Sequence, residues 1–193
     1  MRRFTLRQLS MIAILAALSY VCFTFIQFKI SLPGGDATSV HLGNMVPVLG
    51  ALLFGGLYGG LGGAIGMTIG DLFDPIYVVY APKTFVLKLG IGLVTGLVAH
   101  RLFKLDTEAD RRRQVTDALW SSIAGLGFNA VCDPLVGYLY KLAILGRPAA
   151  EVSLGWNVFA SVVNAVICTA VAVPLYMALR PAVSRLGLDH RRG

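Results

Sequence analysis

Six of the polar or ionisable side chains inside otherwise apolar segments of this chain could contact a ligand. Two are acidic, one is basic and three are amides: Asp71, Asp133, Lys88, Asn129, Asn157 and Asn164. Such side chains are costly within a membrane and are candidates for functional sites by default. Together they can hydrogen-bond a small heteroaromatic molecule and its hydroxyl groups. The plainer alternative is that they only hydrogen-bond neighbouring helices to one another.

Their spacing favours a shared pocket. Asn129 and Asp133 are four residues apart, and Asn157 and Asn164 are seven apart, so each pair lies on one helix face. Most of these residues fall toward one end of their apolar segments, where aromatic side chains also occur. The pattern predicts an outward-facing small-molecule site in which the stacking surfaces come from Tyr77, Tyr80 and Trp156. Tyrosine and tryptophan also occupy membrane interfaces without any ligand role.

Catalytic and metal-binding patterns are absent from the sequence. There is no HExxH motif, no Walker motif and no visible nucleophile–base pair. The three cysteines have no metal-ligand spacing and are interpreted as buried structural thiols. We therefore expect no enzyme activity, no catalytic residues, no metal and no cofactor.

The composition indicates which elements position these residues. The 193 residues are 56% hydrophobic and 14% charged, with a mean hydropathy of +0.71, whereas soluble domains contain about 25% charged residues. The prediction is a single-domain, all-α membrane protein, a bundle of six transmembrane helices over residues 1–193. The expected spans are 9–30, 42–56, 57–73, 84–103, 117–143 and 156–180. The second and third are short for full spans, and a re-entrant hairpin over 42–73 is the alternative.

The basic residues predict the orientation. Under this model, 12 of the 17 Lys and Arg residues lie on one side: Arg2, Arg3, Arg7, Arg101, Lys104, Arg111, Arg112, Arg113, Arg180, Arg185, Arg191 and Arg192. The positive-inside rule makes that side, with both termini, cytoplasmic. The net charge of +7 therefore reflects membrane topology, and no nucleic-acid partner is expected. The lipid bilayer of the cell membrane is the expected location.

Two further features concern a lid and a partner. A polar stretch follows the first span and contains Asp36, His41 and Asn44, which are expected to form an outer lid loop. Small residues four apart, including Gly62, Gly66 and Gly70, predict close helix packing. Ala13 and Ala17 have the same spacing on the first helix, where they serve either packing or the docking of a partner helix.

The run from His41 to Leu97 resembles the S components of energy-coupling-factor (ECF) transporters, most closely the riboflavin-type branch. The matching features are an HLGN-like start, a glycine-rich ALLFG…YGG…G…GD run and a P-x-T-F-x-x-K segment. The stretch from Leu154 to Tyr176 is similar to the last helix of that family. The chain departs from the family at Gly56 and Thr68, and at Ala160 and Ser161 in the last helix, which leaves the identity of the ligand open.

The resemblance implies a six-helix subunit that binds a B-group vitamin or vitamin precursor from outside. The candidates are riboflavin, hydroxymethylpyrimidine and pyridoxine-like compounds. It also implies docking through the first helix, at Ala13 and Ala17, on a transmembrane scaffold subunit driven by two ATPase subunits. The alternative is a structural or assembly membrane protein whose polar residues only hold helices together. An intramembrane enzyme is the least favoured hypothesis.

Overall fold

The computed structural model describes residues 5–32, 35–144, 146 and 150–188. The main helices are α1 (Leu6–Phe25), α2 (Met45–Phe54), α3 (Gly56–Leu72), α4 (Ala81–Gly96), α5 (Arg111–Ala143) and α6 (Ala150–Arg185), with strands β1 (Gln27–Leu32) and β2 (Asp36–His41) between α1 and α2. The 3₁₀ turn η1 (Val78–Tyr80) precedes α4, the π-helix η2 (Leu97–Leu102) continues it, and the 3₁₀ turn η3 (Leu105–Thr107) comes before α5. Four of the basic residues used to predict orientation, Arg2, Arg3, Arg191 and Arg192, lie outside the described residues.

The short helix α2 forms the centre of the bundle. Every residue from Met45 to Leu53 is buried, and α2 packs against α1, α3, α4, α5 and α6. Such a helix is apolar on all sides because no face meets solvent. Its ten residues span about 15 Å, half of a typical hydrocarbon core of ~30 Å.

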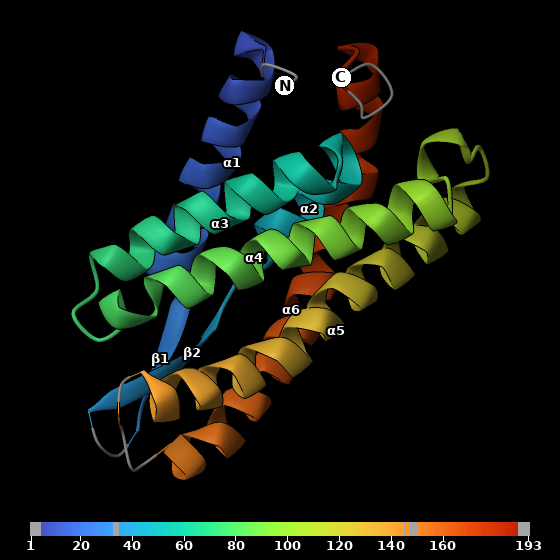
Figure 1. Ribbon diagram of the computed structural model, residues 1–193. Coiled ribbons are helices and arrows are strands. Elements are labelled where there is room, and N and C mark those ends of the chain that lie inside the picture. Colours follow the sequence, from blue (N-terminus) through green and yellow to red (C-terminus); the bar gives the residue numbers. More distant parts are fainter. Residues whose placement is uncertain (1–4, 33–34, 145, 147–149, 189–193) are drawn as a thin grey trace.

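The sequence predicts that the segment 42–73 forms either two membrane spans or a re-entrant hairpin. Here the chain forms two helices joined at Gly55, whose φ of 104° is a conformation that glycine adopts readily. Figure 1 shows this junction at the same end of the molecule as both chain termini and the connection between α4 and α5. The hairpin of β1 and β2 and the connection between α3 and α4 lie at the opposite end.

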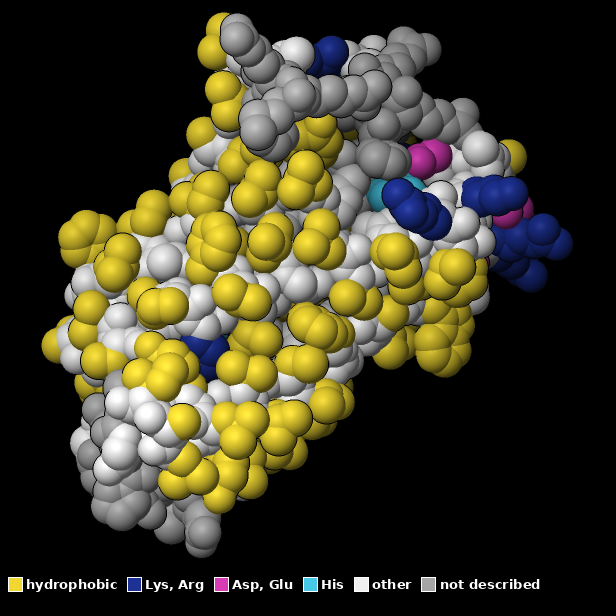
Figure 2. Space-filling model, in the orientation of Figure 1, with side chains coloured by type: hydrophobic (Ala, Val, Ile, Leu, Met, Phe, Trp, Pro, Cys, Tyr) yellow, Lys and Arg dark blue, Asp and Glu magenta, His cyan; other side chains and the backbone are white. Residues whose placement is uncertain are grey.

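The outer surface of the bundle is apolar. Among the described residues, three helical stretches are long and apolar enough to cross a membrane: Leu6–Phe25, Val78–Leu102 and Ser153–Arg185. Many large hydrophobic side chains on their outer faces are exposed, such as Ile14, Val86 and Val166. Figure 2 shows hydrophobic side chains spread over the visible face, with Lys and Arg gathered near the connection between α4 and α5.

Glycines allow three helices to approach closely, as their spacing predicts. A Cβ on Gly66 would collide with the carbonyl oxygen of Ala16 on α1, and one on Gly70 would meet the ring of Phe23. On the other side of α3, a Cβ on Gly92 of α4 would collide with the backbone of Gly60. These glycines therefore serve intramolecular packing, with α3 between α1 and α4.

The segment after α1 departs from the all-α expectation. The first helix ends at Phe25, not near residue 30, and β1 and β2 form an antiparallel hairpin whose register pairs Gln27 with His41 and Leu32 with Asp36. Aromatic and β-branched side chains in QFKISL and DATSVH favour strands. Pairing also satisfies the backbone groups along the shared edge of the two strands. The expected lid loop is thus a two-stranded sheet of residues 27–32 and 36–41, called the hairpin below.

Candidate functional site

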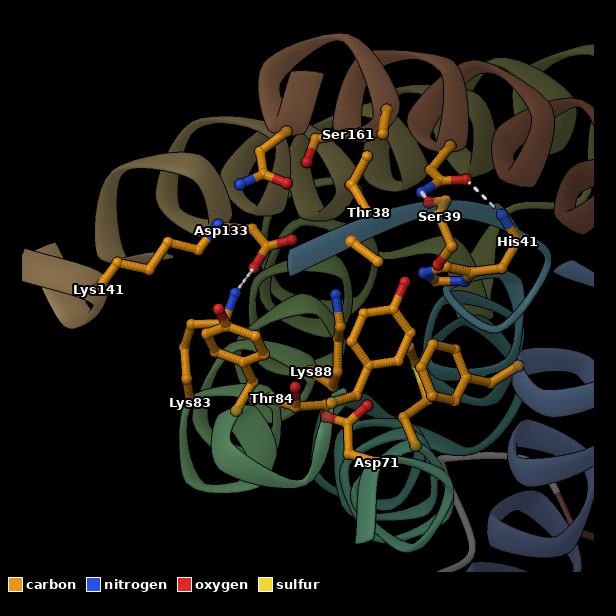
Figure 3. Close-up of a pocket in the computed structure, with 18 residues that line it drawn as sticks. Thr38, Ser39, His41, Asp71, Lys83, Thr84, Lys88, Asp133, Lys141 and Ser161 are labelled. Atoms are coloured by element: carbon orange, nitrogen blue, oxygen red, sulfur yellow. Dashed lines mark hydrogen bonds and ion pairs between the residues drawn. The ribbon is translucent and has the colours of Figure 1, made fainter. Parts of the chain in front are cut away.

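A partly open cavity lies between the hairpin and the ends of the helices that face it. Its volume is about 90 Å³, and its wall combines side chains from α1, β2, α3, η1, α4, α5 and α6 with Tyr77 from the segment between α3 and η1. Figure 3 shows polar groups from opposite walls pointing toward one another. The lining residues are Phe23, Ala37, Thr38, Ser39, His41, Met67, Asp71, Tyr77, Tyr80, Lys83, Thr84, Lys88, Asp133, Lys141, Asn157, Ala160, Ser161 and Asn164.

Two ion pairs join the elements around the cavity. Lys83 Nζ on α4 lies 2.6 Å from Asp133 Oδ1 on α5. Lys141 on α5 pairs with Asp36 on β2, and both side chains are almost fully buried. The Tyr80 hydroxyl donates a hydrogen bond to Asp36 Oδ1 over 2.9 Å. Asp36 therefore fixes one end of the hairpin to α5 and to the turn before α4.

Two buried charges in the cavity wall have no oppositely charged partner within ion-pair distance among the described residues. Lys88, 4% exposed, donates a hydrogen bond to the neutral amide of Asn129 over 3.0 Å. Asp71, 3% exposed, has an Oδ2 atom without a hydrogen-bond partner, although Thr84 lies beside its carboxylate. Because buried charges normally require compensation, these two groups are the ones a bound molecule would best satisfy.

Asn164 connects α6 to the free edge of β2. Its Oδ1 accepts a hydrogen bond from the His41 backbone N–H over 2.8 Å. Its Nδ2 donates one to the Ser39 carbonyl over 3.0 Å. The side-chain amide thereby takes the place of a neighbouring strand, satisfying backbone groups that would otherwise be buried without partners.

His41 stands at the end of β2 and faces the cavity. Its Nδ1 accepts a hydrogen bond from the Gly43 N–H over 3.1 Å, so Nε2 carries the proton of the neutral ring. Phe23 packs edge-on against the ring, at a centroid distance of 4.9 Å. Burial, together with the nearby Lys88 charge, lowers the pKa of His41 to about 3, and the ring is a neutral hydrogen-bond donor at physiological pH.

A third ion pair holds the other strand of the hairpin. Lys29 on β1 pairs with Asp74, which follows α3, and lies 4.7 Å from the ring centroid of Tyr77. The Asp74 carboxylate also accepts hydrogen bonds from the N–H groups of Ile76 and Tyr77. Partial burial acts to raise the pKa of Asp74, but the bond from Lys29 and the two backbone bonds outweigh it and hold the pKa below its ordinary value.

The cavity brings together most of the residues selected from the sequence. Its wall includes Asp71, Tyr77, Tyr80, Lys88, Asp133, Asn157, Asn164 and, from the expected lid, His41. Asn129 stands behind Lys88 rather than in the wall. Asp36 supports Tyr80 and Lys141 from outside the lining.

Two selected residues lie elsewhere. Trp156 is 47% exposed, packs edge-on against Phe159 and does not line the cavity. Its neighbour Asn157 faces inward, and consecutive helix residues point about 100° apart. Asn44 is buried at the start of α2, where its side chain makes no capping hydrogen bond.

Several lining residues had not been selected as site residues, including Lys83, Thr84, Lys141 and Ser161. Helical spacing could have identified some of them. Lys141 is eight residues after Asp133 and therefore on the same face of α5, and Ser161 lies between Asn157 and Asn164 on one face of α6. The polar hairpin residues Thr38 and Ser39 could not be found in this way, because strand pairing determines where they point.

Ala13 and Ala17 lie on the outer face of α1. Both are exposed, whereas Ile12, Leu15, Ala16 and Ser19 are buried against the bundle. Within the described part of the chain, the two alanines therefore leave a shallow open strip on α1 and do not serve packing.

Comparison with protein families identifies the chain. Residues 3–181 match the family model described as ECF-type riboflavin transporter, S component. The chain belongs to this family. A search of curated proteins finds no match.

Family membership makes this S component an integral membrane subunit for vitamin uptake. The family is one of transporter components rather than of enzymes. The apolar spans agree with a membrane subunit, and the polar cavity offers room for a small molecule.

Proposed function

We propose that this S component captures a B-group vitamin or vitamin precursor from outside the cell and holds it in the cavity beneath the hairpin. Riboflavin, hydroxymethylpyrimidine and pyridoxine-like heteroaromatic compounds are the candidate ligands. The observation that carries the proposal is the cavity with Asp71, Lys88 and Asn157 in its wall. Tyr77 and Tyr80 supply ring surfaces, and Asn129 and Asp133 support the basic groups.

The hairpin acts as the lid in this proposal. It covers the cavity through Thr38, Ser39 and His41, and ion pairs fasten it at Lys29 and Asp36. A ligand enters when these pairs open. The protein crosses the plasma membrane six times with both termini in the cytoplasm, so that the lid faces outward.

Energy for uptake comes from partners. The exposed strip at Ala13 and Ala17 on α1 docks on the ECF transmembrane scaffold subunit and, through it, couples to two ATPase subunits. Small side chains suit this role because they let helix backbones approach closely within lipid.

Larger side chains on the strip test the proposal. In a reconstituted complex, Ala13→Leu combined with Ala17→Leu is expected to abolish vitamin uptake while the isolated S component still binds the vitamin, because the cavity is untouched. Ile14→Leu, on the same exposed face, is the matched control and should retain both. Uptake that persists in the double variant would contradict docking at this strip. Folded wild-type protein that binds no vitamin would instead favour a purely structural role.

A further inference from the structure

Some charged side chains around the cavity form ion pairs with one another, and others do not. Lys83 is paired with Asp133, and Lys141 is paired with Asp36. Lys88 and Asp71 are both buried in the same wall, and neither forms an ion pair with a described residue. The cavity wall therefore carries one unpaired positive group, Lys88, and one unpaired negative group, Asp71, and the sum of these two charges is zero.

These two positions come from neighbouring helices. Asp71 lies in the last turn of α3, and Lys88 lies on α4, four residues after Thr84 and on the same face. The Asp71 Oδ2 atom can accept a hydrogen bond, and it has no protein donor. The Lys88 ammonium has three donors, of which one is used by Asn129.

The size of the cavity sets a second condition. Its volume of about 90 Å³ is below the ~150 Å³ of a protein cavity that holds benzene. Pockets for drug-sized ligands have volumes of roughly 300 Å³ or more. A one-ring compound therefore matches this space far better than a three-ring flavin with its sugar-alcohol chain, which needs a severalfold larger space.

We infer that the cavity selects a one-ring heteroaromatic compound without net charge that presents an N–H donor edge to Asp71 and an acceptor edge to Lys88. This rests on the proposed function and narrows its ligand class. A hydroxypyridine such as pyridoxine fits in its zwitterionic form, with a ring N–H⁺ and a phenolate oxygen. An aminopyrimidine fits through its amino group and its ring nitrogen. A phosphate ester does not fit, because its two negative charges meet one unpaired cation and the Asp71 carboxylate.

Calorimetry with purified protein in lipid nanodiscs tests the inference with named probes. The probes are pyridoxine, hydroxymethylpyrimidine in its amino form, riboflavin and pyridoxine phosphate. We expect one of the one-ring probes to bind at least tenfold more tightly than riboflavin, and pyridoxine phosphate to bind at least tenfold more weakly than pyridoxine if pyridoxine is that probe. Tighter binding of pyridoxine would identify the ligand as a pyridine, and tighter binding of hydroxymethylpyrimidine would identify it as a pyrimidine.

Two variants test the residues. Asp71→Asn and Lys88→Met should each weaken binding of the preferred one-ring probe about 10- to 100-fold, the loss expected for one hydrogen bond to a charged group. The double variant Asp71→Asn, Lys88→Met removes both charges but keeps the net charge of the protein, so weaker binding by this variant cannot result from a changed net charge. Trp120→Phe, at an exposed position on α5, is the control and should bind as the wild type does. Unfolding temperatures measured without ligand identify any variant that fails to fold, and the wild-type comparison of probes does not depend on the variants.

The possible failures are distinct. Riboflavin binding more tightly than either one-ring probe would overturn the inference and leave the proposed function intact. The inference would also fail if folded Asp71→Asn and Lys88→Met proteins bound with wild-type affinity. Folded wild-type protein that binds none of the probes would overturn the inference and count against the proposed function as well.

Discussion

Asn164 joins helix α6 to strand β2 of the hairpin. Its side-chain amide accepts a hydrogen bond from the His41 N–H and donates one to the Ser39 carbonyl. An asparagine in a membrane helix is easily interpreted as a contact between helices or with a ligand. Here its donor and acceptor are both directed to the backbone of a strand, and it thereby positions the cavity wall.

Removing this amide should loosen β2. Asn164→Ala leaves a buried N–H and a buried carbonyl without partners, a cost of about 1–3 kcal/mol for each such group. Hydrogen–deuterium exchange should show faster exchange of the β2 amides without ligand. Asn157→Ala, on the same helix but without a bond to β2, is the control. Unchanged exchange in the Asn164 variant would show that pairing with β1 alone holds the strand.

At the scale of elements, the close approach of α1 and α3 requires a residue without a side chain at Gly66. The Cα of Gly66 lies so close to Ala16 that a methyl group would meet a backbone oxygen, and backbone in a helix cannot rotate away as a side chain can. The same helix α1 presents Ala13 and Ala17 outward. One face of α1 is thus fixed to the bundle while the opposite face stays open.

A single methyl group at Gly66 should separate these helices. Gly66→Ala is expected to destabilise the protein by about 1–3 kcal/mol, the usual cost of overpacking, measured as a lower unfolding temperature in detergent. Gly127→Ala on α5 is the matched control, since its added Cβ meets nothing within 4 Å. It should be neutral or slightly stabilising because alanine favours helices. Equal unfolding temperatures for the two variants would contradict the importance of this contact.

The elements also show what sequence patterns could predict. Apolar length and helical spacing predicted the helical segments, the glycine contacts and the inward faces carrying Asp133 and Asn157. They did not predict the hairpin, because a short stretch such as QFKIS fits the end of a helix as well as a strand. They also placed Trp156 in the site, since the position of a residue at a helix end does not say which side of the helix faces the cavity.

On the scale of the whole molecule, the hairpin and the basic connection between α4 and α5 lie at opposite ends (Figure 1). This separation suits a protein that opens on one side of a membrane and has its positive charges on the other. Between these ends, β1 continues the direction of α1, and β2 returns antiparallel to it and leads into α2 (Figure 1).

Labelling of single cysteines tests this orientation. In a protein with Cys132→Ala, a membrane-impermeant maleimide added to intact cells should label Pro75→Cys, in the exposed segment after α3. It should label Ala109→Cys, in the connection before α5, only after the cells are broken. The opposite pattern would reverse the proposed topology, and labelling of both in intact cells would contradict a continuous barrier between them.

The ion pair between Lys29 and Asp74 makes the hairpin sensitive to ionic strength. The two side chains are 31% and 18% exposed, so dissolved salt screens their attraction, over a Debye length of about 8 Å at 0.15 M. The buried pair of Lys141 and Asp36 is shielded from this screening. Rising salt therefore weakens one strand of the hairpin and not the other. The residence time of a trapped molecule would then depend on the salinity of the medium around the cell.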